Sequence, residues 1–224
     1  MTFFNHVRLM RTAAPVLAIV LAAAIPAMPQ GKGKGGDNDP DRPAAGGGLP
    51  AGWAVRTDRG TADQEKVTEA GGVFHFVISP AATFYNNSWT KTGNYKFSAR
   101  MTQIKKASHP TSYGVMIGGS GMGTATQKYT YFMVRQGGEY FISNWEGAAP
   151  VTQVNWTASP AIQKEGADGK QVNTLGVEIQ GDNAIFSVNG MEVKRLPKAG
   201  LHVDGLYGFR IGHNLDIDVD QVSK

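Results

Sequence analysis

Residues 184–196 read AIFSVNGMEVKRL, and this stretch decides the fold. Short runs rich in apolar side chains stand on both sides of Asn189-Gly190. An Asn-Gly pair at the centre favours a type I′ turn, whose twist matches that of the two flanking strands. The stretch therefore predicts a β-hairpin.

The same strand character continues in both directions from this hairpin. Apolar and other side chains alternate with a period of two in segments 95–102, 113–118, 131–135, 175–180, 207–212 and 215–220. Turn signals such as Gly71-Gly72, Gly137-Gly138 and Asp204-Gly205 separate the runs. We expect roughly twelve to fourteen short strands and no helix of three turns, which indicates an all-β sandwich or barrel.

The first residues have the three parts of a secretory signal peptide. Arg8 and Arg11 precede an Ala-rich apolar run at 13–25, and small residues follow at Ala24 and Ala27. The run is shorter than the ~20 residues that a membrane span needs. We expect a signal peptide at 1–27, a flexible Gly/Pro-rich linker at 28–48 and one sandwich domain at 49–224. This organisation predicts an exported protein, periplasmic or secreted, with no membrane span after leader removal.

The composition limits the kinds of partner. The 224-residue chain has a formal net charge of +4 and no cysteine. Arg8 and Arg11 lie in the leader, so 20 basic and 18 acidic residues remain after it. Without a clustered basic face, a nucleic-acid partner is not expected. No pair of histidines has metal-ligand spacing, so we predict neither a metal nor a cofactor.

The order of the later strands resembles that of a known superfamily. The segments 128–135, 139–145 and 173–179, the 186–193 hairpin and the segment 205–212 follow one another as in the concanavalin A-like lectin/glucanase superfamily. They are similar in particular to bacterial exported domains related to the 3-keto-disaccharide hydrolase family. The resemblance implies a two-sheet antiparallel jelly roll with one concave face, where glycans often bind. No Glu fits the Glu-x-Asp-x-x-Glu strand of the retaining glucanases, so the catalytic residues stay unknown.

Aromatic and charged side chains give the candidate ligand-binding residues. Sugar rings stack on flat aromatic rings, while guanidinium and carboxylate groups bind hydroxyls. The predicted set is Trp89, Tyr131, Arg135, Trp145, Glu146, Arg210, His213 and Asp216. Trp89 is placed in a loop-like stretch, and His213 at a turn. The alternative is that the Trp and Tyr rings close the ends of the core.

Asp216, Asp218 and Asp220 share one face of the last predicted strand. They can hold a cation or contact sugar hydroxyls. The interpretation we favour is a solvated face that carries charge to discourage edge pairing.

Three functions follow from the sequence. The first is a carbohydrate- or glycan-binding module that uses a concave aromatic and arginine face. The second is a hydrolase or lyase that acts on glycosides, and it needs two acid/base groups converging in the cleft. The third is a cell-surface interaction module with no small ligand.

Overall fold

A computed structural model of the protein describes residues 48–223. The predicted signal peptide at 1–27, and the predicted linker except Gly48, lie outside the described residues. Fourteen strands form two sheets of seven, and every strand pair is antiparallel. The helical segments of the described chain are two short 3-10 turns.

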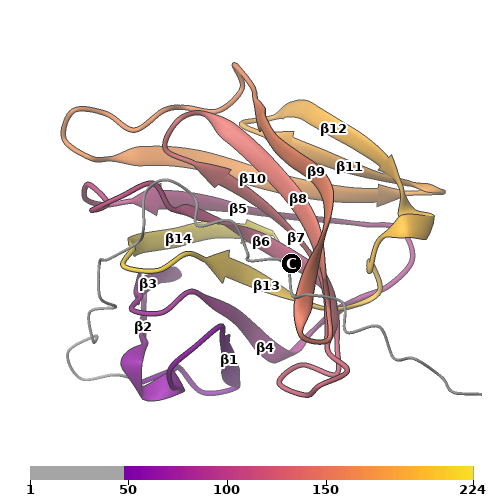
Figure 1. The fold of residues 1–224 in the computed structure, drawn as a ribbon, viewed down its shortest axis with the longest axis horizontal. Coiled ribbons are helices and arrows are strands. Elements are labelled where there is room, and N and C mark those ends of the chain that lie inside the picture. Colours follow the sequence, from indigo (N-terminus) through magenta and orange to yellow (C-terminus); the bar gives the residue numbers. More distant parts are fainter. Residues whose placement is uncertain (1–47, 224) are drawn as a thin grey trace, which may run out of the picture. The chain divides into compact units, whose positions relative to one another are not determined.

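The two sheets are named here by their strand orders. Sheet 1 runs β1 (Trp53–Thr57), β4 (Ala82–Lys91), β13 (Gly205–Ile211), β6 (Ser112–Ser120), β7 (Lys128–Arg135), β8 (Glu139–Glu146) and β9 (Ala149–Ala158). Sheet 2 runs β12 (Met191–Pro197), β11 (Asn183–Val188), β10 (Gln171–Gln180), β5 (Tyr95–Gln103), β14 (Asp216–Ser223), β3 (Val73–Val77) and β2 (Lys66–Ala70). Figure 1 shows the strands of both sheets. The sandwich expected from the sequence is confirmed.

The last two strands occupy inner positions in the sheets. β13 lies between β4 and β6 in sheet 1, and β14 lies between β3 and β5 in sheet 2. The C-terminal segment therefore joins an early group of strands to a later group in both layers.

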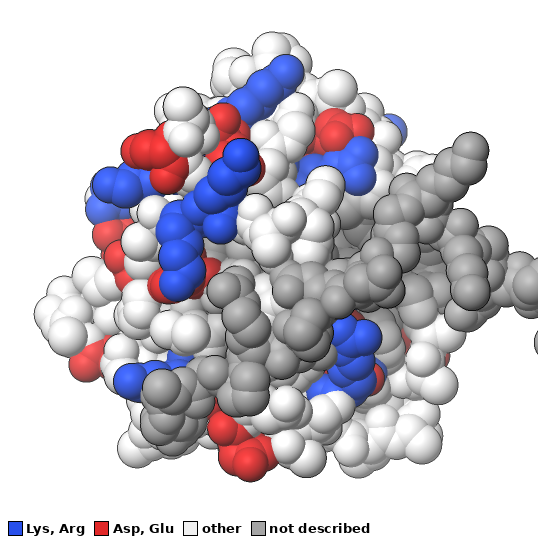
Figure 2. Space-filling view, turned by 60° about the vertical axis from the view of Figure 1, so that its left-hand side comes forward, with Lys and Arg blue, Asp and Glu red and all other residues white. Residues whose placement is uncertain are grey.

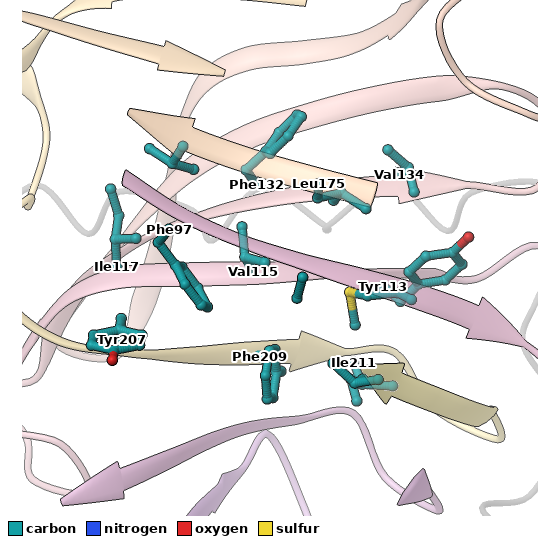
Figure 3. Packing of buried hydrophobic residues seen from close by; sticks show 14 of the residues in the cluster. Phe97, Tyr113, Val115, Ile117, Phe132, Val134, Leu175, Tyr207, Phe209 and Ile211 are labelled. Carbon is teal, nitrogen blue, oxygen red and sulfur yellow. The ribbon is translucent and has the colours of Figure 1, made fainter. Parts of the chain in front are cut away.

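The core between the sheets is built from the alternate positions that the sequence predicts. Phe97 of β5, Phe132 of β7, Phe186 of β11 and Phe209 of β13 are fully buried. Phe97 lies 4.7 Å from the ring of Tyr207, measured between centroids, and Figure 3 shows such rings meeting in the interior. The opposite positions of each strand therefore face away from the core.

The hairpin at Asn189-Gly190 forms as predicted. Both residues have positive φ, 52° and 81°, which a type I′ turn requires. The Asn189 side chain also holds neighbouring segments: its amide donates to the carbonyl of Ala161 and to the side chain of Asn173. The turn therefore fixes both the register of β11 with β12 and the loop before β10.

Candidate functional site

The outer side of sheet 1 is concave, and one contact shows how strongly it curves. The guanidinium of Arg56 on β1 lies 4.0 Å from the ring centroid of Trp145 on β8. These strands are five positions apart in the sheet, which is about 24 Å in a flat sheet. The Thr83 hydroxyl of β4 likewise donates to the Tyr129 hydroxyl of β7 at 3.2 Å. Sheet 1 therefore curls around the side chains of its outer face.

Aromatic and sulfur-containing side chains fill the middle of this concave face. They form a cluster separate from the main core, made of Tyr85, Met116, Tyr129, Tyr131, Met133 and Trp145. The Trp145 ring is stacked with Tyr129 at 6.0 Å and is covered by Arg56. Trp145 lies on the concave face, but with 8% exposure it offers no open stacking surface.

Arg210 is the charged centre of the concave face. Its guanidinium donates to both carboxylate oxygens of Asp58 and to the Thr83 hydroxyl. It also lies 5.8 Å from the ring centroid of Tyr131 and 5.6 Å from that of Trp145. Burial is the largest single influence and lowers the pKa of Arg210, but the charge and hydrogen bonds of Asp58, together with the nearby tyrosines, outweigh it and the net direction is upward. Arg210 is therefore a buried cation with a fixed orientation.

The tyrosines beside Arg210 are neutral. Burial is the largest cause that raises the pKa of Tyr129 and of Tyr131, although the charge of Arg210 works in the opposite direction. These hydroxyls therefore act near neutral pH as hydrogen-bonding groups and carry no negative charge.

Two adjoining hollows open at one end of the concave face. The first, of about 260 Å³, is lined by Asp58, Arg59, Ala81 and His213. The second, of about 310 Å³, shares Ala81 and His213 with the first. Its other lining residues are Pro110, Thr111, Ser112, Tyr131, Met133, Phe141, Trp156, Arg210 and Gly212. The second hollow therefore combines aromatic rings, hydroxyl-bearing residues and a guanidinium.

Aromatic rings on the last two strands of sheet 1 form one wall of the second hollow. Trp156 of β9 stacks on Phe141 of β8, with 5.1 Å between centroids and 29° between planes. The guanidinium of Arg135 lies 4.5 Å from the centroid of Trp156 and is bound to Glu139. Arg135 therefore positions the wall.

His213 lies at the turn that the sequence predicts, where Asn214 has a φ of 54°. Its ring lies 4.3 Å from that of His109, measured between centroids. His213 lines both hollows, so it joins Tyr131 and Arg210 at this end of the face.

Trp89 corrects the sequence prediction. It belongs to β4 and is part of the core between the sheets. Its ring packs 5.0 Å from Trp53 and is stacked with Tyr207 at 5.4 Å. Trp89 therefore packs in the core, which is the alternative role considered for the Trp and Tyr rings, and it does not reach the concave face.

Glu146 and Asp216 also lie away from this site. Glu146 follows Trp145 and is bound to His202 at 2.5 Å and to Lys128 at 3.7 Å. Asp216 belongs to β14 in the other sheet, where it pairs with Lys105 and His75. The structure therefore does not bring these two carboxylates to the hollows.

The aspartates of β14 differ from expectation in their position. β14 is an inner strand, so its charges do not protect a sheet edge. Asp218 is bound to His75 at 2.8 Å, and Asp220 pairs with Arg100 on the neighbouring β5. The acidic face is therefore matched by basic side chains across the strands.

The Arg135–Glu139 pair predicts a dependence of stability on pH. Hydrogen bonds from Arg135 are the largest cause that lowers the pKa of Glu139. The stabilisation is complete above the unfolded-state pKa of Glu, about 4.3, and is lost as the pH falls through the lower folded-state value. We expect Arg135→Gln to cost less than about 1 kcal/mol at pH 6 and less again at pH 2.5, where only the contact of Arg135 with the Trp156 ring is lost. Urea unfolding at both pH values measures this, and an equal cost at both would contradict it.

Several site residues were not predicted from the sequence: Arg56, Asp58, Thr83, Phe141 and Trp156. The period of two contained a signal for Phe141, which shares its face of β8 with Trp145. Asp58 had no local signal, because its partner Arg210 is 152 residues away.

Three surface and sequence properties of the described residues bear on the kind of partner. On the face in Figure 2, Lys and Arg side chains are interspersed with Asp and Glu side chains. No group of three or more His, Asp or Glu side chains among residues 48–223 is arranged to hold a metal ion. No helix in this described part is long and apolar enough to cross a membrane.

Comparison with known proteins gives structural likeness only. No protein-family model and no curated protein matches the sequence. Among solved structures, the chain is similar to the carbohydrate-binding module CBM66 from Bacillus subtilis, with a TM-score of 0.57 and 13% identity over 76% of this chain and 93% of that one. It is also similar to a glycoside hydrolase family 16 endo-glucanase from Bacteroides ovatus, with a TM-score of 0.53 and 11% identity over 76% and 94%. The chain therefore shares the fold of these structures, and this two-sheet antiparallel sandwich is the jelly roll expected from the sequence.

Proposed function

We propose that this protein binds carbohydrate in the hollows at the end of the concave face of sheet 1. The observation that carries the proposal is the second hollow, where the partly exposed rings of Phe141 and Trp156 stand beside Arg210. Flat rings stack against the C–H faces of sugars, and a fixed guanidinium orients their oxygens. The similar carbohydrate-binding module supports this proposal through its fold.

The proposal also includes the place of action. The leader pattern around Arg8, Arg11 and the apolar run 13–25 supports export, so the glycan is one met in the periplasm or outside the cell.

A glycoside-acting enzyme is the second candidate, because Asp58 and His213 line one hollow. Glycoside hydrolysis ordinarily uses two carboxyl groups. Among the described residues that line the two hollows, Asp58 is the single carboxylate, and Arg56 and Arg210 both bind it. Binding is therefore the function we favour. Release of new reducing or unsaturated ends from a bound polysaccharide would instead establish the enzyme.

The test is a binding measurement on a panel of neutral and acidic polysaccharides. We expect the protein to bind at least one, and Trp156→Ala to weaken that binding by about tenfold or more, because a ring of the wall is lost. Val151→Ala is the control: it lies on the same edge strand, is 47% exposed and lines neither hollow.

Thermal unfolding of both variants checks that the fold is kept. Equal loss of binding in the two variants, with the fold intact, would contradict this site. If the wild-type protein binds no polysaccharide of the panel, the proposed function is overturned in favour of an interaction module without a small ligand.

A further inference from the structure

The charges around Arg210 do not balance. Arg56 and Arg210 are both bound to the carboxylate of Asp58, so two guanidinium groups share one negative charge. Their side chains are 14% and 8% exposed, so water reaches them little. A positive charge with limited access to water gains more from an added anion than one on an open surface.

The remaining neighbours of Arg210 do not supply a second negative charge. Thr83 accepts one hydrogen bond from it, while Tyr131 and Trp145 present ring faces. The Nε–H of Arg210 is buried and has no hydrogen-bond partner. A buried donor without an acceptor is costly, so the protein leaves this guanidinium incompletely satisfied.

The second hollow gives a ligand access to this charge. Arg210 lines it, and none of its lining residues among the described part of the chain is a carboxylate. Thr111 and Ser112 also line this hollow, and hydroxyl side chains can hydrogen-bond the oxygens of a sugar.

We infer that the preferred ligand is an acidic sugar polymer whose uronate carboxylate enters the second hollow and binds Arg210, whose charge Asp58 neutralises only in part because Asp58 also binds Arg56. This inference rests on the proposed function, and it adds the chemical class of the ligand. A carboxylate is planar and its geometry matches that of a guanidinium group. A neutral hydroxyl does not match it in this way.

The experiment uses ligand pairs that differ only in charge. Polygalacturonate and alginate are each compared with their methyl-esterified forms by titration calorimetry. We expect the protein to bind at least one acid form about tenfold or more tightly than its ester, which is the size of a charge-assisted contact.

Three variants locate the effect. Arg56→Gln is expected to reduce the preference for the acid to about threefold or less, whereas Arg56→Lys keeps the charge and retains most of the preference. Arg195→Gln is the matched control: it removes the same charge from β12 of sheet 2, where Arg195 pairs with Glu192. Far-UV circular dichroism and thermal unfolding confirm that each variant is folded.

The outcomes separate the two proposals. Equal affinity for acid and ester overturns the acidic ligand but leaves carbohydrate binding standing. Binding to neither the acids, the esters nor neutral glucans overturns the proposed function. A loss in Arg195→Gln equal to that in Arg56→Gln means that overall charge attracts the polymer, and this too overturns the inference.

Discussion

Replacing Phe209 with alanine is expected to lower the free energy of unfolding by about 4 kcal/mol. Phe209 is fully buried on the inner strand β13, and its ring lies within 6.5 Å of those of Trp53, Phe74, Phe76, Trp89 and Phe97, measured between centroids. Both sheets contribute these rings, so neither sheet can close the cavity alone. Urea unfolding followed by fluorescence measures the loss.

Phe141→Ala is the matched control for this prediction. Phe141 is a phenylalanine of the same sheet, but it is only partly buried on the concave face. Its loss is expected to cost about 1–2 kcal/mol, in proportion to the smaller area removed from water. Equal costs for the two variants would show that the space around Phe209 is not the principal core.

Asp58→Ala is expected to cost about 3 kcal/mol, because it leaves Arg210 buried without its carboxylate. Arg210 keeps only 8% of its side chain exposed, while Asp58 keeps 29%, which places the cost at the lower end for a broken buried pair. Glu192→Ala is the control, since its pair with Arg195 is 45% exposed on both sides and is expected to be worth less than about 1 kcal/mol.

A double variant separates the charge from the loss of side-chain volume. Asp58→Ala combined with Arg210→Met removes the unpaired charge and keeps an apolar chain in its place, so we expect it to recover at least half of the stability lost by Asp58→Ala. If the double variant is less stable than Asp58→Ala, an uncompensated charge is not the cause of the loss.

The period of two predicted which side chains share a face. Tyr131 and Arg135 lie opposite Phe132 and Val134 on β7, as the sequence indicates. It did not predict which outer face is concave, because curvature depends on contacts such as Arg56 with Trp145 between distant strands.

Trp89 shows why one strand was missed. β13 pairs with Thr90 through Leu206 and with Tyr85 through Gly208, so the β4 residues 86–89 lie opposite Tyr207. This irregular register breaks the period of two. The residues before Trp89 are Asn86, Asn87 and Ser88, which have the composition of a turn. Asn86 nevertheless belongs to the sheet, where it pairs with Trp53 of β1.

The inner positions of β13 and β14 set the order in which the molecule can assemble. Strands β1 to β4 and strands β5 to β12 are separate groups until residues 205–223 join them in both sheets. During synthesis, these residues leave the ribosome after β1 to β12, so the edges of the earlier strands stay unpaired until then. Joining the two groups of strands therefore requires contacts between residues distant in sequence, which makes folding slow. Both sheets are completed in the same final stage. A chain truncated before β13 is expected to leave both sheets unjoined and to aggregate, while a chain that includes β13 and β14 closes both sheets.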